Sequence, residues 1–298
     1  MSETLTLAHK AVVITGSGRG IGAACAELAA SLGAHVVVND IDPASASETA
    51  ERIVAAGGVA HAHPADIADQ DAARGLVYAC VERFGTIDGL VNNAALMSLG
   101  ELQDHDADRL RRLLDVNVVA GFNCAAAAIT HMLRQGSGSI VNVTSGAHFG
   151  LPQMSDYAAT KGAVASMTYA WAADLVGTGV RVNALSPLAT GAMVSKSKEY
   201  FVSHGMSDVR MDAPEPHTNA PAVAYLLSDR AASVHGQIVR SDGTQLSLVA
   251  HPAVVKPALA RESWTADDVA AAFDETLAAR QSPLGIAWAD EPPHLKAR

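Results

Sequence analysis

The chain alternates apolar runs of strand length with segments of helix length, most of which end at a glycine. The runs that predict strands are residues 10–15, 35–40, 59–63, 88–92, 139–144, 180–185 and 236–240. Because these runs are apolar throughout and helices join them, the pattern predicts a parallel sheet covered on both faces. We therefore expect an α/β fold, a doubly wound parallel sheet of the Rossmann type, with ligands bound at the carboxyl ends of the strands.

The alternating pattern weakens after Pro187. Residues 190–216 mix polar residues with Gly, Pro and two lysines, so we expect a mobile loop with short helices there. No further strand–helix unit is predicted from Gln245 on. The chain is therefore expected to form a dinucleotide-binding and catalytic domain, residues 1–244, followed by a C-terminal helical extension, residues 245–298.

The extension contains one well-marked helix, predicted at residues 266–280. Thr265 is placed as its N-cap and Asp268 occupies the capping-box position, while Trp264 and Val269 have the spacing of a hydrophobic staple. Helices without site chemistry are mostly structural, so we expect this extension to be a packing or oligomer arm.

Composition and charge exclude several classes of protein. Hydrophobic residues make up 49% of the chain and charged residues 17%, which excludes a disordered chain. The net charge is −10 and there is no basic run, so no nucleic-acid partner is expected. His61 and His63 alternate along a predicted strand, but no third ligand follows at metal-binding spacing, so no metal site is expected.

Three features predict a cytoplasmic location and no membrane partner. The three cysteines are far apart and odd in number, which indicates a reduced compartment and no disulfide framework. The N-terminal residues lack the apolar stretch of a secretory signal. The longest charge-free helical stretch, residues 116–133, contains Asn117, Asn123 and His131, whose polar groups would be unpaired in a bilayer.

A glycine cluster lies directly between the first strand and the first helix. Residues 15–22 read Thr-Gly-Ser-Gly-Arg-Gly-Ile-Gly. Glycines at such a turn let the backbone approach a pyrophosphate, whose charge then meets the N–H groups at the start of the helix. The candidate cofactor contacts in this turn are Gly16, Ser17, Arg19, Gly20, Ile21 and Gly22.

Two charged residues bear on the choice of dinucleotide. Asp40 ends the second strand, where a carboxylate can accept hydrogen bonds from the adenosine ribose and would repel a 2′-phosphate. Arg19 favours NADP instead, since a guanidinium in the turn could bind a 2′-phosphate. A buried charge clash is costly, so Asp40 is given more weight and NAD is favoured over NADP.

A second cluster, Tyr157 and Lys161, has the spacing that places two side chains on one face of a helix. A cation beside a phenol stabilises the phenolate and lowers the pKa of the tyrosine. Ser145 follows the fifth strand, so it is expected to meet Tyr157 at the carboxyl edge of the sheet.

Taken in order, these motifs resemble those of the short-chain dehydrogenase/reductase family. The resemblance covers about residues 8–245. It is carried by residues 15–22, Asp40, Asp66-Ile67, Asn92-Asn93-Ala94-Ala95, Asn117, Ser145, Tyr157 with Lys161, and Val182-Asn183 before Pro187. The sequence departs from the family pattern at Ala95 and at Leu188, where the family usually has glycine.

The resemblance implies roles for four residues. Tyr157 would be the general acid or base, and Ser145 would hydrogen-bond the substrate oxygen. Lys161 would hold the nicotinamide ribose and depress the pKa of the tyrosine. Asn117 would anchor a water of a proton relay.

The resemblance also implies further cofactor contacts. Asp66 and Ile67 would flank the adenine, and Asn93 and Ala94 would line the turn after the fourth strand. The remaining contacts that the resemblance implies are Ile41, Pro187 and Thr190.

The activity implied is hydride transfer between NAD and a secondary alcohol or ketone in a homo-oligomer, a dimer or tetramer. The substrate would be of the 3-hydroxyacyl type, because the tail faintly resembles that of the hydroxyacyl-CoA dehydrogenase unit of multifunctional β-oxidation enzymes, or of the hydroxysteroid type, because the loop at residues 190–216 mixes apolar residues with Tyr200 and Phe201. Two alternatives stay open. One is an NADPH-dependent 3-oxoacyl reductase, favoured by Arg19, and the other is a non-catalytic nucleotide-sensing protein.

Overall fold

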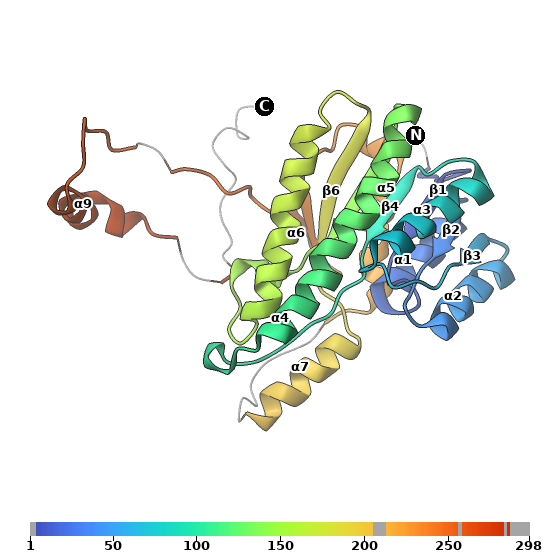
Figure 1. Ribbon diagram of the computed structural model, residues 1–298, viewed down its shortest axis with the longest axis horizontal. Helices are drawn as coiled ribbons and strands as arrows, with labels where there is room; N and C mark the ends of the chain where they lie inside the picture. The colour runs from blue at the N-terminus through green and yellow to red at the C-terminus, as the bar shows by residue number, and fades with distance from the viewer. Residues whose placement is uncertain (1–3, 205–212, 256–257, 283–284, 287–298) are drawn as a thin grey trace. The chain divides into compact units, whose positions relative to one another are not determined.

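The computed structural model describes residues 4–204, 213–255, 258–282 and 285–286. It divides into two compact units, Met1–Val249 and Ala250–Arg298. The first unit is built on one eight-stranded sheet with the order β3-β2-β1-β4-β5-β6-β7-β8 (Figure 1). The strands are β1 Ala11–Ile14, β2 His35–Val38, β3 Val59–Ala62, β4 Gly89–Asn92, β5 Gly138–Val143, β6 Val180–Pro187, β7 Ile238–Ser241 and β8 Leu246–Leu248.

The predicted doubly wound parallel sheet is confirmed, since β1 to β7 pair in parallel. β8 was not predicted; it is a three-residue strand that pairs antiparallel with β7. The strand order reverses between β1 and β4, because β1 pairs with β2 on one side and with β4 on the other. In open α/β sheets, this reversal marks the place where ligands bind.

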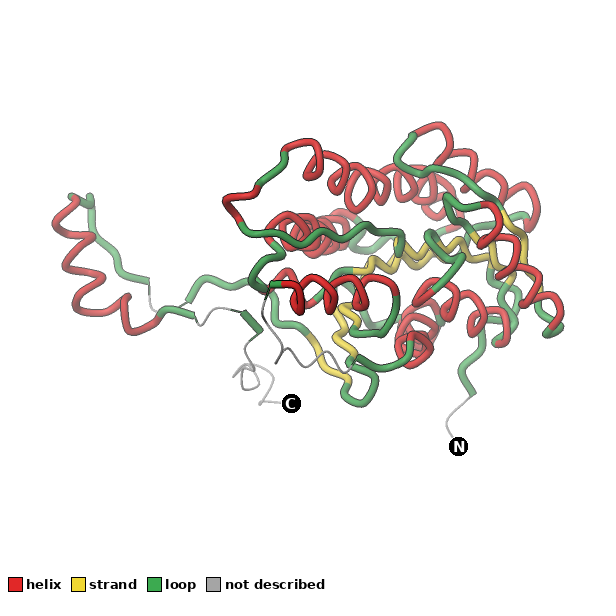
Figure 2. Tube along the Cα trace, turned by 90° about the horizontal axis from the view of Figure 1, so that it is seen from below, coloured by secondary structure: helices red, strands yellow, loops and turns green. Residues whose placement is uncertain are grey.

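Helices cover the sheet on both faces (Figure 2). The helices of the first unit are α1 Gly20–Ser31, α2 Pro43–Ala55, α3 Gln70–Phe84, α4 Ala107–Leu114, α5 Ala120–Gln135, α6 Ser155–Asp174, α7 Ala192–Ser203 and α8 Ala220–Leu227, and the second unit contains α9 Ala266–Ala272. Strand side chains alternate between the two faces: Val12 and Ile14 pack with α1, α2 and α8, whereas Ala11 and Val13 pack with α3, α5 and α6. Both faces of the strands are therefore buried, as their apolar sequences require.

The helical stretch predicted at residues 116–133 is part of a longer helical segment, which a π-helical turn at Asp115–Val119 interrupts between α4 and α5. The whole segment Ala107–Gln135 is long and apolar enough to span a membrane by length and composition alone. However, α5 buries Cys124, Ala125, Ala128 and Met132 against the sheet, as the core helix of a globular domain does.

Residues 192–203 form one regular helix, α7, where the sequence predicted a mobile loop with short helices. The methionine positions 206 and 211 of that loop lie outside the described residues. In the second unit, the predicted capping box is confirmed: Thr265 Oγ1 accepts from the Asp268 N–H, and the Asp268 carboxylate accepts from the Thr265 N–H. The helix continues beyond α9 through a π turn and a 3-10 turn to Arg280.

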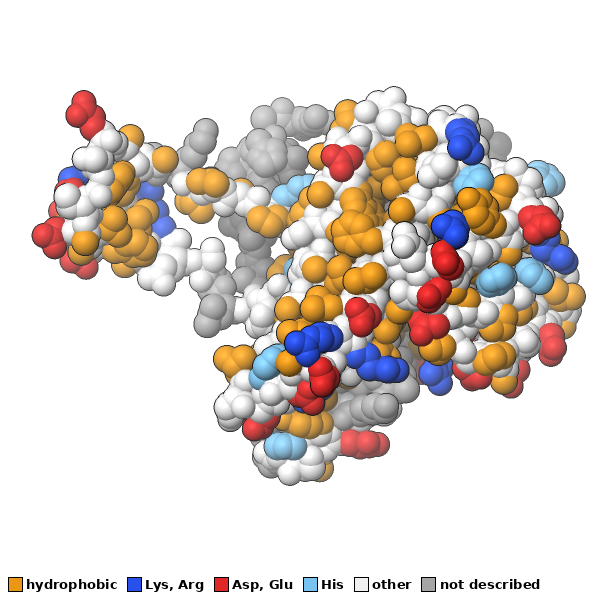
Figure 3. Space-filling view, viewed as in Figure 1, with side chains coloured by type: hydrophobic (Ala, Val, Ile, Leu, Met, Phe, Trp, Pro, Cys, Tyr) orange, Lys and Arg blue, Asp and Glu red, His pale blue; other side chains and the backbone are white. Residues whose placement is uncertain are grey.

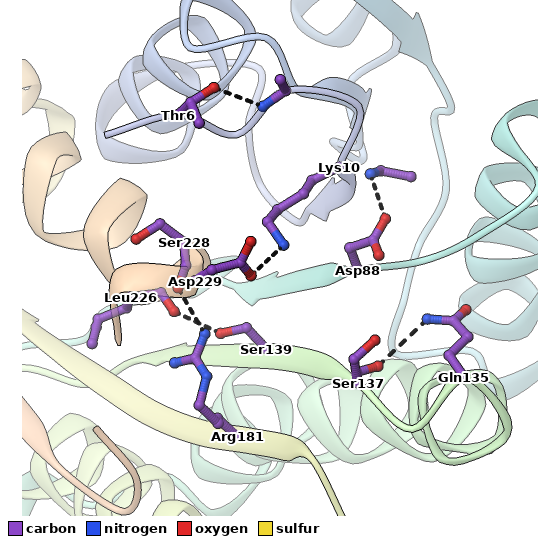
Figure 4. A network of polar contacts seen from close by, with 12 residues as sticks. Thr6, Lys10, Asp88, Gln135, Ser137, Ser139, Arg181, Leu226, Ser228 and Asp229 are labelled. Carbon is purple, nitrogen blue, oxygen red and sulfur yellow. Dashed lines mark hydrogen bonds and ion pairs between the residues drawn. The ribbon is translucent and has the colours of Figure 1, made fainter. Parts of the chain in front are cut away.

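The amino ends of the central strands are joined by a polar network (Figure 4). The Asp88 carboxylate before β4 accepts from the Ala11 N–H of β1 at 2.9 Å. Ser139 at the start of β5 donates to the Leu226 carbonyl of α8 at 2.8 Å. Arg181 of β6 donates to the Ser228 carbonyl at 3.1 Å, and Lys10 pairs with Asp229 at 2.7 Å. These contacts hold the amino ends of the strands to α8 and to the turn that follows it.

Candidate active site

The glycine turn joins β1 to α1 at the reversal of strand order. Two of its glycines are there because the backbone approaches closely: a Cβ on Gly16 would lie 2.7 Å from Ala94 Cα, and a Cβ on Gly22 would lie 2.4 Å from the Gly16 carbonyl oxygen. Gly20 has φ +60° and no atom lies within 4 Å of the place its Cβ would take. The turn is thus tight against the protein on one side and open at the start of α1.

The start of α1 differs from those of the next three helices. Asp42, Asp69 and Asp106 cap α2, α3 and α4 by accepting backbone N–H bonds. Among the described residues no side chain caps α1, whose N-cap residue is Arg19, and its first turn carries no acidic residue. Uncapped N–H groups and the positive end of the helix dipole form an anion site, so this turn fits the pyrophosphate of a dinucleotide.

The turn after β4 is hydrogen-bonded to the glycine turn. Asn93 Nδ2 donates to the carbonyls of Thr15 and Gly16, both at 2.9 Å. Thr15 Oγ1 in turn accepts from the Asn93 and Ala94 N–H groups at 3.0 and 3.1 Å. The amide of Asn93 is therefore occupied by the protein. Ser17 is likewise occupied, donating to the Ile14 carbonyl at 2.7 Å.

Asp40 lies beside this turn and is only 7% exposed. Its carboxylate accepts from the Gly18 N–H at 3.1 Å and from the Asp42 N–H at 3.2 Å. Ile41 next to it is 65% exposed. The pKa of Asp42 is lowered by hydrogen bonds from Ser45 and from the backbone, and also by the nearby Arg19 guanidinium. Two carboxylates, those of Asp40 and Asp42, therefore lie at the end of β2, and Arg19 is close to the second.

The remaining predicted cofactor contacts lie along the carboxyl edge. Ile67 is buried and lines the crevice at the end of β1, whereas Asp66 is exposed and accepts from the Ala68 N–H at 3.1 Å. Pro187 ends β6, and the Thr190 N–H donates to the Pro214 carbonyl at 2.7 Å.

Ser145, Tyr157 and Lys161 come together where β5 ends and α6 begins. Tyr157 is 8% exposed and Lys161 only 2%. The Lys161 ammonium lies 5.8 Å from the centre of the Tyr157 ring and donates to the Val143 carbonyl at 2.8 Å. A hydrogen bond joins the hydroxyls of Tyr157 and Ser145. Spacing on one helix face therefore placed the phenol and the ammonium together correctly.

The protonation of this pair differs from the expectation. The sequence predicted that the ammonium lowers the pKa of the tyrosine. Instead, burial raises the pKa of Tyr157 to about 12, against a smaller lowering by the bond with Ser145. Burial also lowers the pKa of Lys161 to about 8. The expectation was wrong because both groups lose their water on burial, and desolvation disfavours the charged form of each.

Asn117 lies on the π turn and is buried. Its amide donates to the Leu96 carbonyl at 2.8 Å and to Thr160 Oγ1 at 2.9 Å, and its carbonyl oxygen accepts from the Leu96 N–H at 2.7 Å. The side chain therefore joins the segment after β4 to α6; the water that it would anchor stays a prediction. π turns are frequent at functional sites, and no periodic sequence pattern signals one.

A crevice lies between these elements at the carboxyl edge. Its walls come from the ends of β1, β4 and β5, from the π turn and from α6. The lining residues include Thr15, Ile67, Asn92, Ala94, Asn117, Val143 and Lys161. Sequence reasoning missed Thr160, which receives the Asn117 bond, and Thr144, which donates to the Lys161 carbonyl at 2.8 Å. It also missed the ion pair of Asp156 with Arg109, because their partnership spans two helices.

Comparison with known proteins agrees with this geometry. A family model described as short chain dehydrogenase matches residues 10–200. The chain is 35% identical over 249 residues to 2-(S)-hydroxypropyl-CoM dehydrogenase 3 of Xanthobacter autotrophicus, covering 80% of this chain and 96% of that protein. It is 36% identical over 247 residues to 2,5-dichloro-2,5-cyclohexadiene-1,4-diol dehydrogenase of Sphingobium indicum, covering 80% of this chain and 97% of that protein.

A solved structure is similar over more of the chain. The crystal structure of a short chain dehydrogenase from Mycobacterium avium superposes with a TM-score of 0.82 at 28% sequence identity. The match covers 95% of this chain and 100% of that one.

Proposed function

The chain belongs to the short-chain dehydrogenase/reductase family, and on that premise we propose that it transfers a hydride between NAD and a secondary alcohol or ketone. It is therefore an oxidoreductase that acts on a small molecule. The observation that carries the proposal is the buried pair of Tyr157 and Lys161, with Ser145 at the end of β5, on the same sheet edge as an uncapped helix start. Acid–base groups and an anion site at one sheet edge are the two parts that such a reaction needs.

The three side chains have different roles at the substrate oxygen. Tyr157 Oη gives a proton to a ketone oxygen or takes one from an alcohol, and Ser145 Oγ hydrogen-bonds the same oxygen. With a pKa of about 12, the phenol keeps its proton at neutral pH and can donate it to a ketone oxygen. Lys161, still mostly ammonium at neutral pH, supplies positive charge beside the ring. When bound, the nicotinamide supplies or accepts the hydride.

The choice of NAD rests on the end of β2. Asp40 is nearly buried and accepts from two backbone N–H groups, which hold its carboxylate at the end of β2, where it would repel a 2′-phosphate. Asp42 adds a second carboxylate there, which would also repel a 2′-phosphate. NADPH-dependent reduction of a 3-oxoacyl substrate is the alternative, and it depends on Arg19.

The substrate is proposed to be of the hydroxysteroid or 3-hydroxyacyl type. Purified protein is to be assayed with NAD and with NADP against a panel of secondary alcohols and ketones of both types. Turnover with a higher kcat/KM for NAD is expected. Preference for NADP would contradict the Asp40 argument, and tight cofactor binding without turnover would favour the nucleotide-sensing alternative.

We propose further that the protein is a cytoplasmic homo-oligomer, a dimer or tetramer, associated through α5 and α6. Hydrophobic side chains gather over these helices (Figure 3), and Phe122 and Leu133 of α5 are 47% and 45% exposed. Exposed apolar groups on one face are typical of an interface between copies. Light scattering after gel filtration tests this, and a monomeric mass would contradict it.

A further inference from the structure

We propose that Arg109 and Asp156 form a positioning latch that holds residues 96–106 beside Tyr157 and thereby sets the affinity for the substrate. The inference rests on the proposed function. Asp156 lies on the first turn of α6, one residue before Tyr157, and Arg109 lies on α4. Neither residue is expected to touch the reacting atoms.

The ion pair of the latch is sheltered from solvent. Arg109 Nε lies 3.0 Å from Asp156 Oδ2, and His105 Nδ1 lies 3.6 Å from Asp156 Oδ1. The Asp156 side chain is 13% exposed and that of Arg109 34%. On the same helix, Arg111 pairs with Asp108, but those side chains are 71% and 93% exposed. A sheltered pair is screened less by water than an exposed one, so breaking it has the larger effect.

A second set of contacts binds the same two segments. Arg109 Nη2 donates to the Asp104 carbonyl at 3.2 Å, which ties α4 to residues 96–106. The Gly100 N–H donates to the Gln153 carbonyl at 2.9 Å, and Gln153 Nε2 donates to Glu101 at 2.7 Å. Gln153 has φ +60°, a conformation that costs free energy for a non-glycine residue and persists where its surroundings hold it. Residues 96–106 are thus fixed to the chain that leads into Tyr157.

The position of residues 96–106 connects the latch to the substrate side of the site. The segment starts at Leu96. The Leu96 N–H donates to the Asn117 amide oxygen, and the Leu96 carbonyl accepts from the Asn117 amide nitrogen. Next to it, Met97 Sδ accepts from Ser197 Oγ of α7 at 3.8 Å. The segment is therefore bonded both to the chain that leads into α6 and to α7. The cofactor turn is held separately, by the bonds of Asn93 and Thr15, so loosening the latch leaves it in place.

The kinetic test uses Arg109→Gln, Asp156→Asn and the double variant. For each single variant, KM for the alcohol is expected to rise about tenfold, while kcat stays within about threefold and KM for the cofactor is unchanged. The double variant is expected to match the more affected single variant, because both remove one interaction. Arg109→Lys, which keeps the charge, is expected to restore part of the affinity.

Arg111→Gln is the matched control, since it breaks an exposed ion pair on the same helix, and it is expected to behave as wild type. Equal rises of KM for alcohol and cofactor, additive effects in the double variant, or a lower melting temperature with unchanged kinetics would overturn the latch.

Amide hydrogen exchange gives a readout that does not need activity. Asp156→Asn is expected to speed the exchange of the Gly100 N–H and its neighbours, and unchanged exchange would overturn the latch even in an active enzyme. Absence of turnover in the wild-type protein would instead contradict the proposed function, and the exchange result would then decide the latch alone.

Discussion

The two edges of the parallel sheet use the same strands but treat their polar groups differently. At the amino edge, Ser139, Asp88 and Lys10 each have a partner: a carbonyl, a backbone N–H and a carboxylate. At the carboxyl edge, Tyr157 and Lys161 are buried at the expense of their charged forms, and their pKa values move to about 12 and about 8. The start of α1 has no capping side chain among the described residues.

This difference indicates that stability and chemistry are separated along the strands. Groups with satisfied partners contribute to folding, and removing one leaves a buried partner unpaired. Groups held away from their preferred protonation state are typical of functional sites. We therefore expect loss of the Tyr157 hydroxyl to change catalysis more than stability, and substitutions at the amino edge to do the opposite.

The largest expected effect is that of Tyr157→Phe. Losing the general acid–base hydroxyl should lower kcat by about a hundredfold or more. The melting temperature and the cofactor affinity should stay near wild type, because the buried ring remains. Tyr169→Phe, on the same helix, is the control and should keep full activity. Activity that survives Tyr157→Phe would contradict the assignment of the catalytic group.

The pKa of Lys161 makes a prediction about stability and pH. Between about pH 8 and pH 10.5, the unfolded chain keeps a proton on this lysine that the folded chain has released. The unfolded state then binds more protons, so this lysine makes the free energy of unfolding rise with pH through that range, by about 3 kcal/mol. The raised pKa of Tyr157 has the opposite sign but acts only above pH 10.

Denaturant unfolding of wild type and Lys161→Met across this pH range measures the effect. The difference in unfolding free energy between the two proteins should grow in favour of wild type as the pH increases. A constant difference would mean that the ammonium is not desolvated in solution.

A smaller effect is expected at the ribose end of the carboxyl edge. Asp40→Ala removes the carboxylate that would repel a 2′-phosphate, so the ratio of kcat/KM for NADP to that for NAD should rise about tenfold, a change of about 1.4 kcal/mol. Asp42→Ala, at the half-buried carboxylate two residues on, should shift this ratio less. An unchanged ratio for Asp40→Ala would remove the main support for NAD.

Much of the fold could be predicted from the sequence because its strands are short and apolar and alternate with helical segments, most of which end at a glycine. The features that were missed are those without a periodic signal. β8 has three residues and exists through its pairing with β7. The π turn at Asp115–Val119 adds no residue type that distinguishes it from the helices on either side.

In the site, too, features set by nearby residues could be predicted, and features set by segments remote in sequence could not. The spacing of Tyr157 and Lys161 placed them together, but their pKa values depend on burial by segments that are remote in sequence. Arg109 and Asp156 are 47 residues apart, so nothing local indicates that they pair. Local patterns identify which groups are present, whereas packing decides how they are charged and held.

The smallest expected effect is at the amino edge, and it tests whether a substitution there changes stability without changing catalysis. Ser139 is buried, and Ser139→Ala would leave the Leu226 carbonyl without its 2.8 Å bond, so the free energy of unfolding should fall by about 1 kcal/mol. Ser31→Ala is the matched control, since its hydroxyl donates to the Leu28 carbonyl at the same 2.8 Å but is exposed. Both variants should keep wild-type kcat and KM. Loss of activity in Ser139→Ala at unchanged stability would show that the two edges are not separate, because a polar contact at one end of the strands would then be controlling chemistry at the other.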